Sequence, residues 1–177
     1  MHNNVKALLA TTLLFFSSQS MANSGCGFED KQDGFLATCS EEKQEVILTG
    51  AVTHQELNEF DWFNNEYTNY KADTAIVAKL QKVDKPTQVT VIIGTWCPDC
   101  HRETPRFIRL IEEINNPNIE VIYIGVDREK QDPQALAANY EFSRIPTFIV
   151  EQNDEEIGRI VERPEVSLEA DLAKILK

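Results

Sequence analysis

The alternation of apolar and polar positions divides the chain into three stretches. Residues 7–16 form one mainly apolar run, which ends in the polar segment SSQS. Between residues 53 and 83, apolar side chains recur every three or four positions, the spacing of a buried helical face. From residue 88 onward, short β-branched runs alternate with amphipathic segments. This pattern predicts strands at 88–95, 119–126, 147–152 and 155–162, with helices at 97–115, 132–141 and 168–177.

The order of these elements predicts an α/β fold in the C-terminal half. The sequence DKP at residues 84–86 interrupts the helical pattern, so we place a boundary there and expect residues 86–177 to form one domain. Its order is β-α-β-α-β-β-α, in which strands joined through helices run parallel and the last two strands form an antiparallel hairpin. Residues 23–85 are then an N-terminal extension, a hairpin with strands at 35–39 and 45–49 followed by helices. Predicted helix caps are Ser167 and the pair Thr53 and Glu56.

Residues 1–22 have the layout of a secretory signal peptide. Lys6 precedes the apolar run, and the small residues Ser20 and Ala22 suit cleavage after Ala22. The run is too short to cross a bilayer, which needs about 20 residues. We therefore expect a cleaved signal, export to the periplasm or out of the cell, and no membrane contact by the mature chain. An uncleaved anchor or a buried helix would also account for the apolar run.

The net charge of the chain argues against two classes of binding partner. It carries 29 acidic and 17 basic residues, a formal net charge of −12. Loss of Lys6 with the signal would bring the mature chain to −13 (−12 − 1). A chain of this charge repels nucleic acids and anionic membrane surfaces, so we expect neither as a partner.

The segment Cys97-Pro-Asp-Cys100-His101 contains the candidate chemistry. It fits C-x-x-C, a redox dithiol, and also C-x-x-C-H, the attachment site of a c-type haem. Cys97 stands where a predicted strand becomes a helix, and the free N–H groups of a helix start stabilise a thiolate. Cys100, about one turn further on, could attack a mixed disulfide that Cys97 forms with a substrate. Pro98 suits the first turn of a helix.

The haem and zinc interpretations lack further ligands. A c-type haem held by His101 usually takes a Met or a second His as its other ligand. Met1 and Met21 both lie in the predicted signal, which leaves only His54 as a possible second ligand in the mature chain. A structural zinc site usually needs four ligands in closely spaced pairs, whereas Cys26 and Cys39 have 12 residues between them. We therefore expect no metal and no other cofactor.

Several features in a fixed order resemble the thioredoxin superfamily, in particular its exported bacterial thioredoxin-like proteins. They are the strand and motif VIIGTWCPDC at residues 91–100, Pro105 eight residues after Cys97, RIPTFIV at 144–150, and EEIGRIVE with Gly158 in its midst. The resemblance covers about residues 86–177. It implies the thioredoxin fold, a central mixed sheet flanked by helices.

The resemblance also implies a function. The chain would be a thiol–disulfide oxidoreductase, a reductase or an isomerase-like enzyme, acting on protein dithiols and disulfides and recharged by a separate redox partner. Cys97 would be the nucleophile and Cys100 the resolving thiol of a redox-active disulfide. The residues that would shape the site and contact substrate are Trp96, Pro98, Asp99, Ile145 and a cis-Pro146. The alternative is a redox-inert binding module on the same fold, against which the intact C-x-x-C argues.

Two positions indicate how the dithiol is tuned. Thioredoxin has a buried Asp six residues before the first Cys, and here that position is Val91, which cannot act as a base. The charge of Asp99 should disfavour the Cys97 thiolate, while His101 and Arg102 partly offset it. We expect a mildly reducing or intermediate couple. Glu103 and His101 are expected to be solvated helix residues.

The remaining cysteines, Cys26 and Cys39, are predicted to form a structural disulfide. Closing a loop of this size would contribute about 3 kcal/mol in the chain-entropy model. The alternative is a second redox pair that relays electrons to Cys97 and Cys100.

Overall fold

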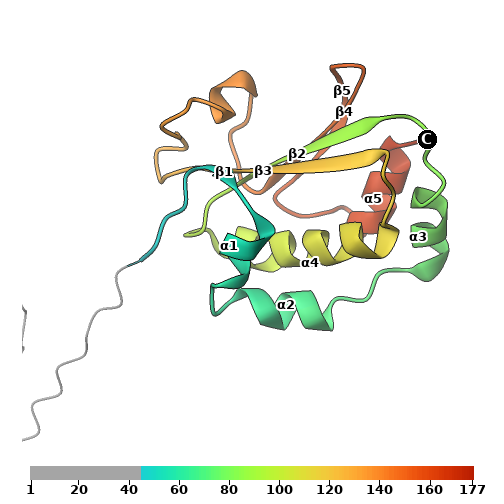
Figure 1. Ribbon diagram of the computed structural model, residues 1–177, viewed down its shortest axis with the longest axis horizontal. Helices are drawn as coiled ribbons and strands as arrows, with labels where there is room; N and C mark the ends of the chain where they lie inside the picture. The colour runs from blue at the N-terminus through green and yellow to red at the C-terminus, as the bar shows by residue number, and fades with distance from the viewer. Residues whose placement is uncertain (1–44) are drawn as a thin grey trace, which may run out of the picture. The chain divides into compact units, whose positions relative to one another are not determined.

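The computed structural model describes residues 45–177, which form a mixed five-stranded sheet with strand order β1-β3-β2-β4-β5 (Figure 1). The predicted signal peptide, the strand expected at 35–39 and the Cys26–Cys39 pair lie outside the described residues. The site is positioned by this sheet and by the helices that follow its strands.

The central strand β2 (Thr87–Ile93) organises the sheet. It runs parallel to β3 (Ile119–Gly125) and antiparallel to β4 (Thr147–Gln152). β4 continues into the antiparallel strand β5 (Glu155–Val161), and the short strand β1 (Gly50–Val52) pairs antiparallel with the far edge of β3. The sequence of β2 is an apolar, β-branched run because both faces of this strand are covered by other parts of the chain. Nearly all of its residues are buried.

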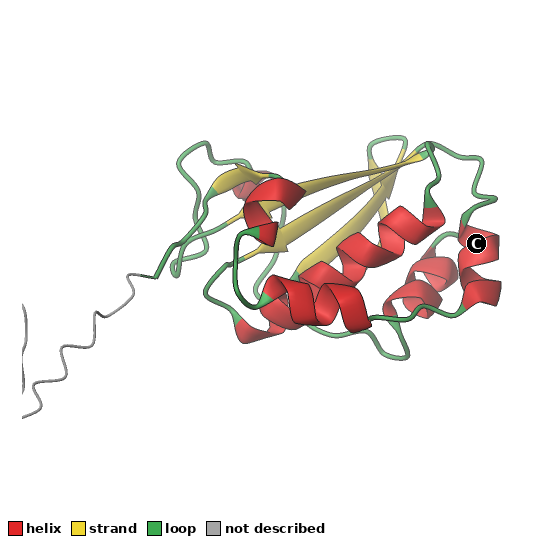
Figure 2. Cartoon of the chain, turned by 60° about the horizontal axis from the view of Figure 1, so that its bottom comes forward, coloured by secondary structure: helices red, strands yellow, loops and turns green. Residues whose placement is uncertain are grey.

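The long helix α4 (Pro98–Ile114) follows β2, and α5 (Leu168–Ile175) ends the chain. Three short helices precede β2 in the sequence: α1 (His54–Asn58), α2 (Phe63–Asn69) and α3 (Thr74–Leu80). Figure 2 shows α4 and its helical neighbours gathered on the same side of the sheet. Two predicted caps are confirmed, since Thr53 and Glu56 form a capping box and Ser167 accepts the N–H of Ala170.

Different segments of the chain pack on the two faces of the sheet. On the α4 side, the rings of Phe107 and Phe148 meet with centroids 4.7 Å apart. On the opposite side, Tyr140, from the segment between β3 and β4, makes a 3.0 Å hydrogen bond to Thr90. The apolar residues of β2 therefore lie in a core that is closed above and below.

The direction of β4 corrects one prediction. The segment 132–141 does not form the expected helix, and only the short 3-10 turn η1 (Ala137–Asn139) appears in it. The carboxylate of Asp132 instead accepts the N–H groups of Gln134, Leu136 and Ala137, and Ala135 takes a left-handed φ of 55°. β4 pairs antiparallel with β2, so the expectation of parallel strands also fails for β4.

The N-terminal part of the described chain packs on the same core. The strand expected at 45–49 is not formed, and the strand begins at Gly50 instead. Arg106 of α4 binds Glu66 of α2 at 2.7 Å, and Tyr67 of α2 donates a hydrogen bond to Glu112 of α4. Residues 45–85, the part of the expected extension that is described, thus belong to one compact unit with residues 86–177.

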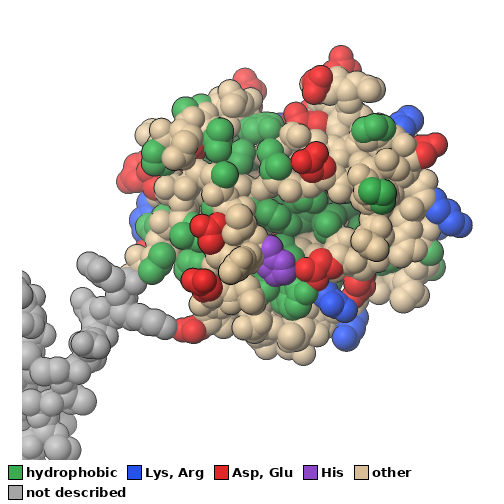
Figure 3. Space-filling view, in the orientation of Figure 1, with side chains coloured by type: hydrophobic (Ala, Val, Ile, Leu, Met, Phe, Trp, Pro, Cys, Tyr) green, Lys and Arg blue, Asp and Glu red, His purple; other side chains and the backbone are tan. Residues whose placement is uncertain are grey.

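Acidic side chains are spread over the face shown in Figure 3, with hydrophobic side chains visible between them. Across residues 45–177, no helix has both the length and the apolar composition that crossing a bilayer requires.

Candidate functional site

The two described cysteines meet at the carboxyl end of the central strand. β2 ends at Ile93, and Cys97 is the N-cap of α4 with extended backbone, so that Pro98 opens the helix as expected. Both cysteines are free thiols; Cys97 is 9% exposed and Cys100 is 1% exposed. Both cysteines are therefore buried, and the nucleophile candidate Cys97 is the more exposed of the two.

The surroundings of Cys97 favour its thiolate. A hydrogen bond from the Cys100 thiol is the largest influence on its pKa, and burial opposes it. The backbone N–H groups of Cys100 and Asp99 lower the pKa further, while the charge of Asp99 raises it. The balance lowers the pKa of Cys97 from 9.0 to about 6. Asp99 thus acts in the predicted direction, but the helix start and the second thiol outweigh it.

Cys100 has the opposite character. Burial, followed by the hydrogen bond to Cys97, raises the pKa of its thiol far above the ordinary range. Its sulfur also accepts the N–H of Gly94 at 3.4 Å. Val91, which occupies the position of the buried aspartate of thioredoxin, is fully buried in β2. Cys100 therefore stays a neutral thiol while Cys97 ionises.

The segment Ile145–Pro146 forms the wall facing Cys97. The peptide bond between these residues is cis, and both are buried. The Cys97 sulfur donates a 3.5 Å hydrogen bond to the carbonyl of Ile145, which stands just before β4. The structure thus brings together the dithiol and the Ile145–Pro146 pair, which lie more than 40 residues apart in the sequence.

Trp96 closes another side of the site. Its indole N–H donates to the carbonyl of Val126 at 3.0 Å, and the guanidinium of Arg128 lies over the ring, 5.2 Å from the centroid. A Cβ at Gly94 would come within 2.8 Å of the indole. Trp96 therefore packs flat on the strand end only because residue 94 has no side chain.

His101 is not the solvated residue that we expected. It is half-buried, its Nε2 lies 2.7 Å from the carbonyl oxygen of Thr95, and its ring stacks on Trp62 with centroids 4.4 Å apart. Trp62 comes from the connection between α1 and α2, so the prediction failed because a segment distant in sequence covers α4. His101 packs and supports the loop before Cys97.

A contact between Thr95 and the residues before β1 was also not predicted from the sequence. The Thr95 hydroxyl accepts the N–H of Leu48 at 3.1 Å and donates to the carbonyl of Val46 at 2.9 Å. Residues 46–48 are thereby fastened to the loop that carries Cys97. No local pattern in the sequence signals this contact, because the partners are 47 and 49 positions apart.

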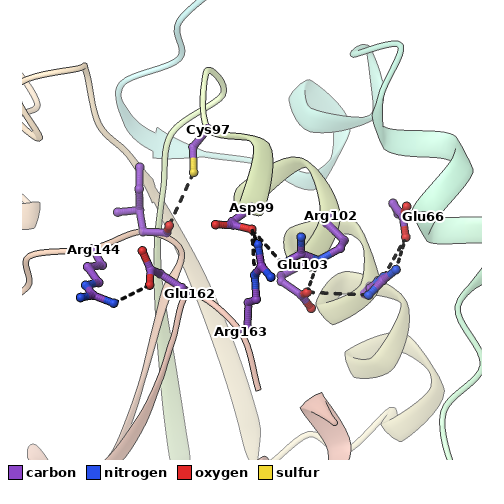
Figure 4. A network of polar contacts seen from close by, with 10 residues as sticks. Glu66, Cys97, Asp99, Arg102, Glu103, Arg144, Glu162 and Arg163 are labelled. Atoms are coloured by element: carbon purple, nitrogen blue, oxygen red, sulfur yellow. Dashed lines mark hydrogen bonds and ion pairs between the residues drawn. The ribbon is translucent and has the colours of Figure 1, made fainter. Parts of the chain in front are cut away.

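Asp99 belongs to a chain of ion pairs beside the dithiol, shown in Figure 4. Its carboxylate is bound by Arg102 at 2.9 Å and by Arg163 at 3.0 Å. Burial raises the pKa of Asp99, but the hydrogen bonds from Arg163 and Arg102 outweigh it and lower the pKa overall. The motif carboxylate is thus ionised and held between two guanidinium groups.

Glu103 corrects the second expectation of a solvated residue. Its side chain is only 4% exposed, and Arg102 binds it at 2.6 Å with Arg106 at 3.7 Å. Helix α2 brings Glu66 to Arg106 and so covers this part of α4. Among residues 45–177, no group of three His, Cys, Asp or Glu side chains is arranged to hold a metal ion.

Comparison with known proteins agrees with this geometry. A family model described as Thioredoxin matches residues 48–174, which include all five strands. Thioredoxin H-type of Brassica campestris is 26% identical over 98 residues, covering 54% of this chain and 75% of the relative. Thioredoxin H5 of Oryza sativa subsp. japonica is 31% identical over 75 residues, covering 42% of this chain and 51% of the relative.

Among solved structures, Fasciola hepatica thioredoxin is 25% identical, with a TM-score of 0.39, and the match covers 56% of this chain and 88% of that one. The family match alone spans well over half of the 177 residues. The mixed five-stranded sheet with its helices is the thioredoxin fold, and the chain belongs to the thioredoxin family.

Proposed function

We propose that this chain is an exported thiol–disulfide oxidoreductase that exchanges disulfides with protein substrates through Cys97 and Cys100. Membership of the thioredoxin family supports a thioredoxin-like redox function at a coarse level. The observation that carries the proposal is the contrast between the two thiols. Cys97 stands at a helix start with its pKa lowered to about 6, and Cys100 lies buried beside it with a raised pKa.

The contrast assigns the order of events. The Cys97 thiolate attacks one sulfur of a substrate disulfide, and the other substrate sulfur leaves as a thiolate that takes a proton from water. Cys100 then loses its proton to solvent and attacks the Cys97 sulfur of the mixed disulfide. The Cys97–Cys100 disulfide forms, and the second substrate sulfur leaves and is protonated. The substrate gains two electrons from the dithiol and two protons, of which one balances the proton that Cys100 releases and the other comes from water; the reverse sequence oxidises a substrate dithiol.

The walls of the site suit a polypeptide substrate. Pro98 is exposed next to Cys97, while Ile145 and Pro146 present a stretch of backbone opposite it. The carbonyl of Ile145 holds the Cys97 sulfur in the resting dithiol. An extended substrate segment that lies along this wall would bring its disulfide to Cys97. A separate redox partner then returns the pair to its starting state.

The lowered pKa of Cys97 bears on the reduction potential of the pair. A stabilised thiolate favours the dithiol form, which makes the disulfide a better oxidant than a pair with ordinary thiols. We propose an intermediate couple, suited to reducing or rearranging disulfides when the partner keeps the pair reduced.

Insulin reduction tests the proposed activity. The wild type, with dithiothreitol as electron donor, should accelerate insulin precipitation, and Cys97→Ser should abolish the acceleration. Cys100→Ser should instead accumulate a mixed disulfide with the substrate, because the first attack still occurs. The matched control replaces Cys26 and Cys39 by Ser. Equal rates for wild type and Cys97→Ser would refute the proposal and favour a redox-inert binding module.

Export is the second part of the proposal, and the layout of residues 1–22 supports it. Expression of the full chain in a host with a secretory pathway should yield a mature protein outside the cytoplasm whose first residue is Asn23. N-terminal sequencing of the fractionated protein measures this. A cytoplasmic protein that retains Lys6 would refute export without touching the redox proposal.

A further inference from the structure

The turn that follows β5 reaches across to the active-site motif. Arg163 lies in this turn, and both Nε and Nη2 of its guanidinium contact Oδ1 of Asp99, at 3.2 and 3.0 Å. Asp99 lies between the two cysteines in the sequence. An arginine 64 positions away thus binds the one charged residue inside the C-x-x-C motif.

The turn itself is fixed against the opposite wall of the site. The N–H of Glu162 donates to the carbonyl of Pro146 at 2.7 Å, and Glu162 takes a left-handed φ of 59°. The Glu162 carboxylate also binds Arg144 at 2.8 Å. The backbone of the turn is therefore held by the Pro146 segment while the Arg163 side chain extends to Asp99, as Figure 4 shows.

The pair leaves the Cys97 sulfur facing away from the Asp99 charge. In Figure 4 the Asp99 carboxylate turns toward Arg163 and Arg102, whereas the Cys97 sulfur points to the carbonyl of Ile145. Arg102 is shared with the buried carboxylate of Glu103, which it binds at 2.6 Å. Within residues 45–177, the carboxylate of Asp99 is the only one with which Arg163 forms an ion pair.

We propose that Arg163 is a positioning residue for the Cys97 thiolate, which it favours by holding the Asp99 carboxylate away from the sulfur. This deepens the proposed function, on which it rests, because it names a residue that regulates the nucleophile. A free Asp99 charge beside the sulfur repels the thiolate, and the guanidinium both neutralises and orients that charge. The charge of Asp99 is among the influences that raise the pKa of Cys97.

The direct test measures how fast Cys97 reacts with iodoacetamide as a function of pH, in the full-length reduced protein. Mass spectrometry of the Cys97 peptide follows this one thiol and ignores the other cysteines. Arg163→Gln should move the midpoint of the profile upward by about 0.3–0.5 pH units, a loss of about two- to threefold in rate at pH 5.5. Asp99→Asn should move the midpoint downward.

A double variant separates action through Asp99 from a direct effect of the Arg163 charge. In the Asp99→Asn background, Arg163→Gln should shift the midpoint by less than half as much as it does alone. An equal shift in both backgrounds would show that Asp99 is not involved and would overturn the proposal. So would an unchanged midpoint in Arg163→Gln.

Arg144→Gln is the matched control. Arg144 and Arg163 have side chains that are 65% and 67% exposed, and each binds one carboxylate near the site. Both substitutions remove one positive charge, but only Arg163 binds the motif. Arg144→Gln should shift the midpoint by less than half as much as Arg163→Gln, and an equal shift would overturn the proposal. Because alkylation needs no protein substrate, these results stand whether or not insulin is reduced.

Discussion

The pH dependence of the Cys97–Cys100 reduction potential follows from the two unequal thiols. Reduction of the disulfide takes up two protons when both thiols are neutral, and each proton changes the potential of a two-electron couple by about 30 mV per pH unit. Below pH 6 the slope should therefore be about −59 mV per pH unit. Above pH 6 Cys97 remains a thiolate, so the slope should fall to about −30 mV per pH unit.

The lowered pKa of Cys97 also determines how far the reduction potential at neutral pH differs from that of a pair of ordinary thiols. Compared with a thiol of pKa 9.0, a thiol of pKa about 6 stabilises the dithiol about tenfold at pH 7. This corresponds to a potential about 30 mV more oxidising. Because the thiolate is the favoured form, the extra stability of the dithiol is present above pH 6 and is lost as the pH falls below it.

Equilibration with glutathione buffers between pH 4.5 and 8.5, followed by acid quench and mass tagging of free thiols, measures the potential at each pH. Cys26→Ser combined with Cys39→Ser leaves a single pair to titrate. A slope near −59 mV per pH unit that persists to pH 8 would refute the assignment of a lowered pKa to Cys97. A second break below pH 8.5 would mean that Cys100 ionises in this range, against its burial.

The other predictions concern packing and the second cysteine pair. Phe63→Ala removes a fully buried ring of α2 and should lower the free energy of unfolding by about 3–5 kcal/mol in a single urea transition. A separate early transition would contradict the common core of residues 45–177. Glu103→Gln should cost about 1.5–3 kcal/mol, because two arginines lose a buried carboxylate, while the exposed control Glu129→Gln should cost almost nothing. Similar urea midpoints for both variants would contradict this. Replacing Cys26 and Cys39 by Ser should lower the Tm and leave insulin reduction intact; lost turnover at unchanged Tm would instead indicate an electron relay.

The four strands after residue 86 were predictable because their signal is local, whereas β1 was not. The run TFIVEQ matches β4 residue for residue, since an apolar stretch bounded by Pro146 and a turn can be read without its partners. The direction of β4 could not be read in this way. It is set by the pairing of β4 with β2, a strand distant in sequence. The helix expected before β4 is missing because the Asp132 side chain binds three N–H groups of the following turn, which leaves only a short 3-10 turn.

The dithiol was also predictable, because the strand, the motif and the two prolines lie in the sequence order of the family. The surroundings of α4 were not. His101 and Glu103 look like surface residues of an amphipathic helix until Trp62 and Glu66 are brought over them. Contacts between positions about 40 apart leave no mark in the local pattern, so the polar residues that support the site came to light only in three dimensions.

The two edges of the sheet differ in how they are shielded from pairing with another strand. β1 covers β3 only from Tyr123 to Gly125, next to the active-site end, and the exposed Glu120 lies in the uncovered half. The opposite edge, β5, carries Glu155, Glu156 and Arg159 at exposed positions. Charges on an open edge discourage another strand from pairing with it. A chain shortened to begin at residue 86 would lose β1 and expose the apolar end of β3, so we expect such a chain to aggregate edge to edge more readily than the full chain.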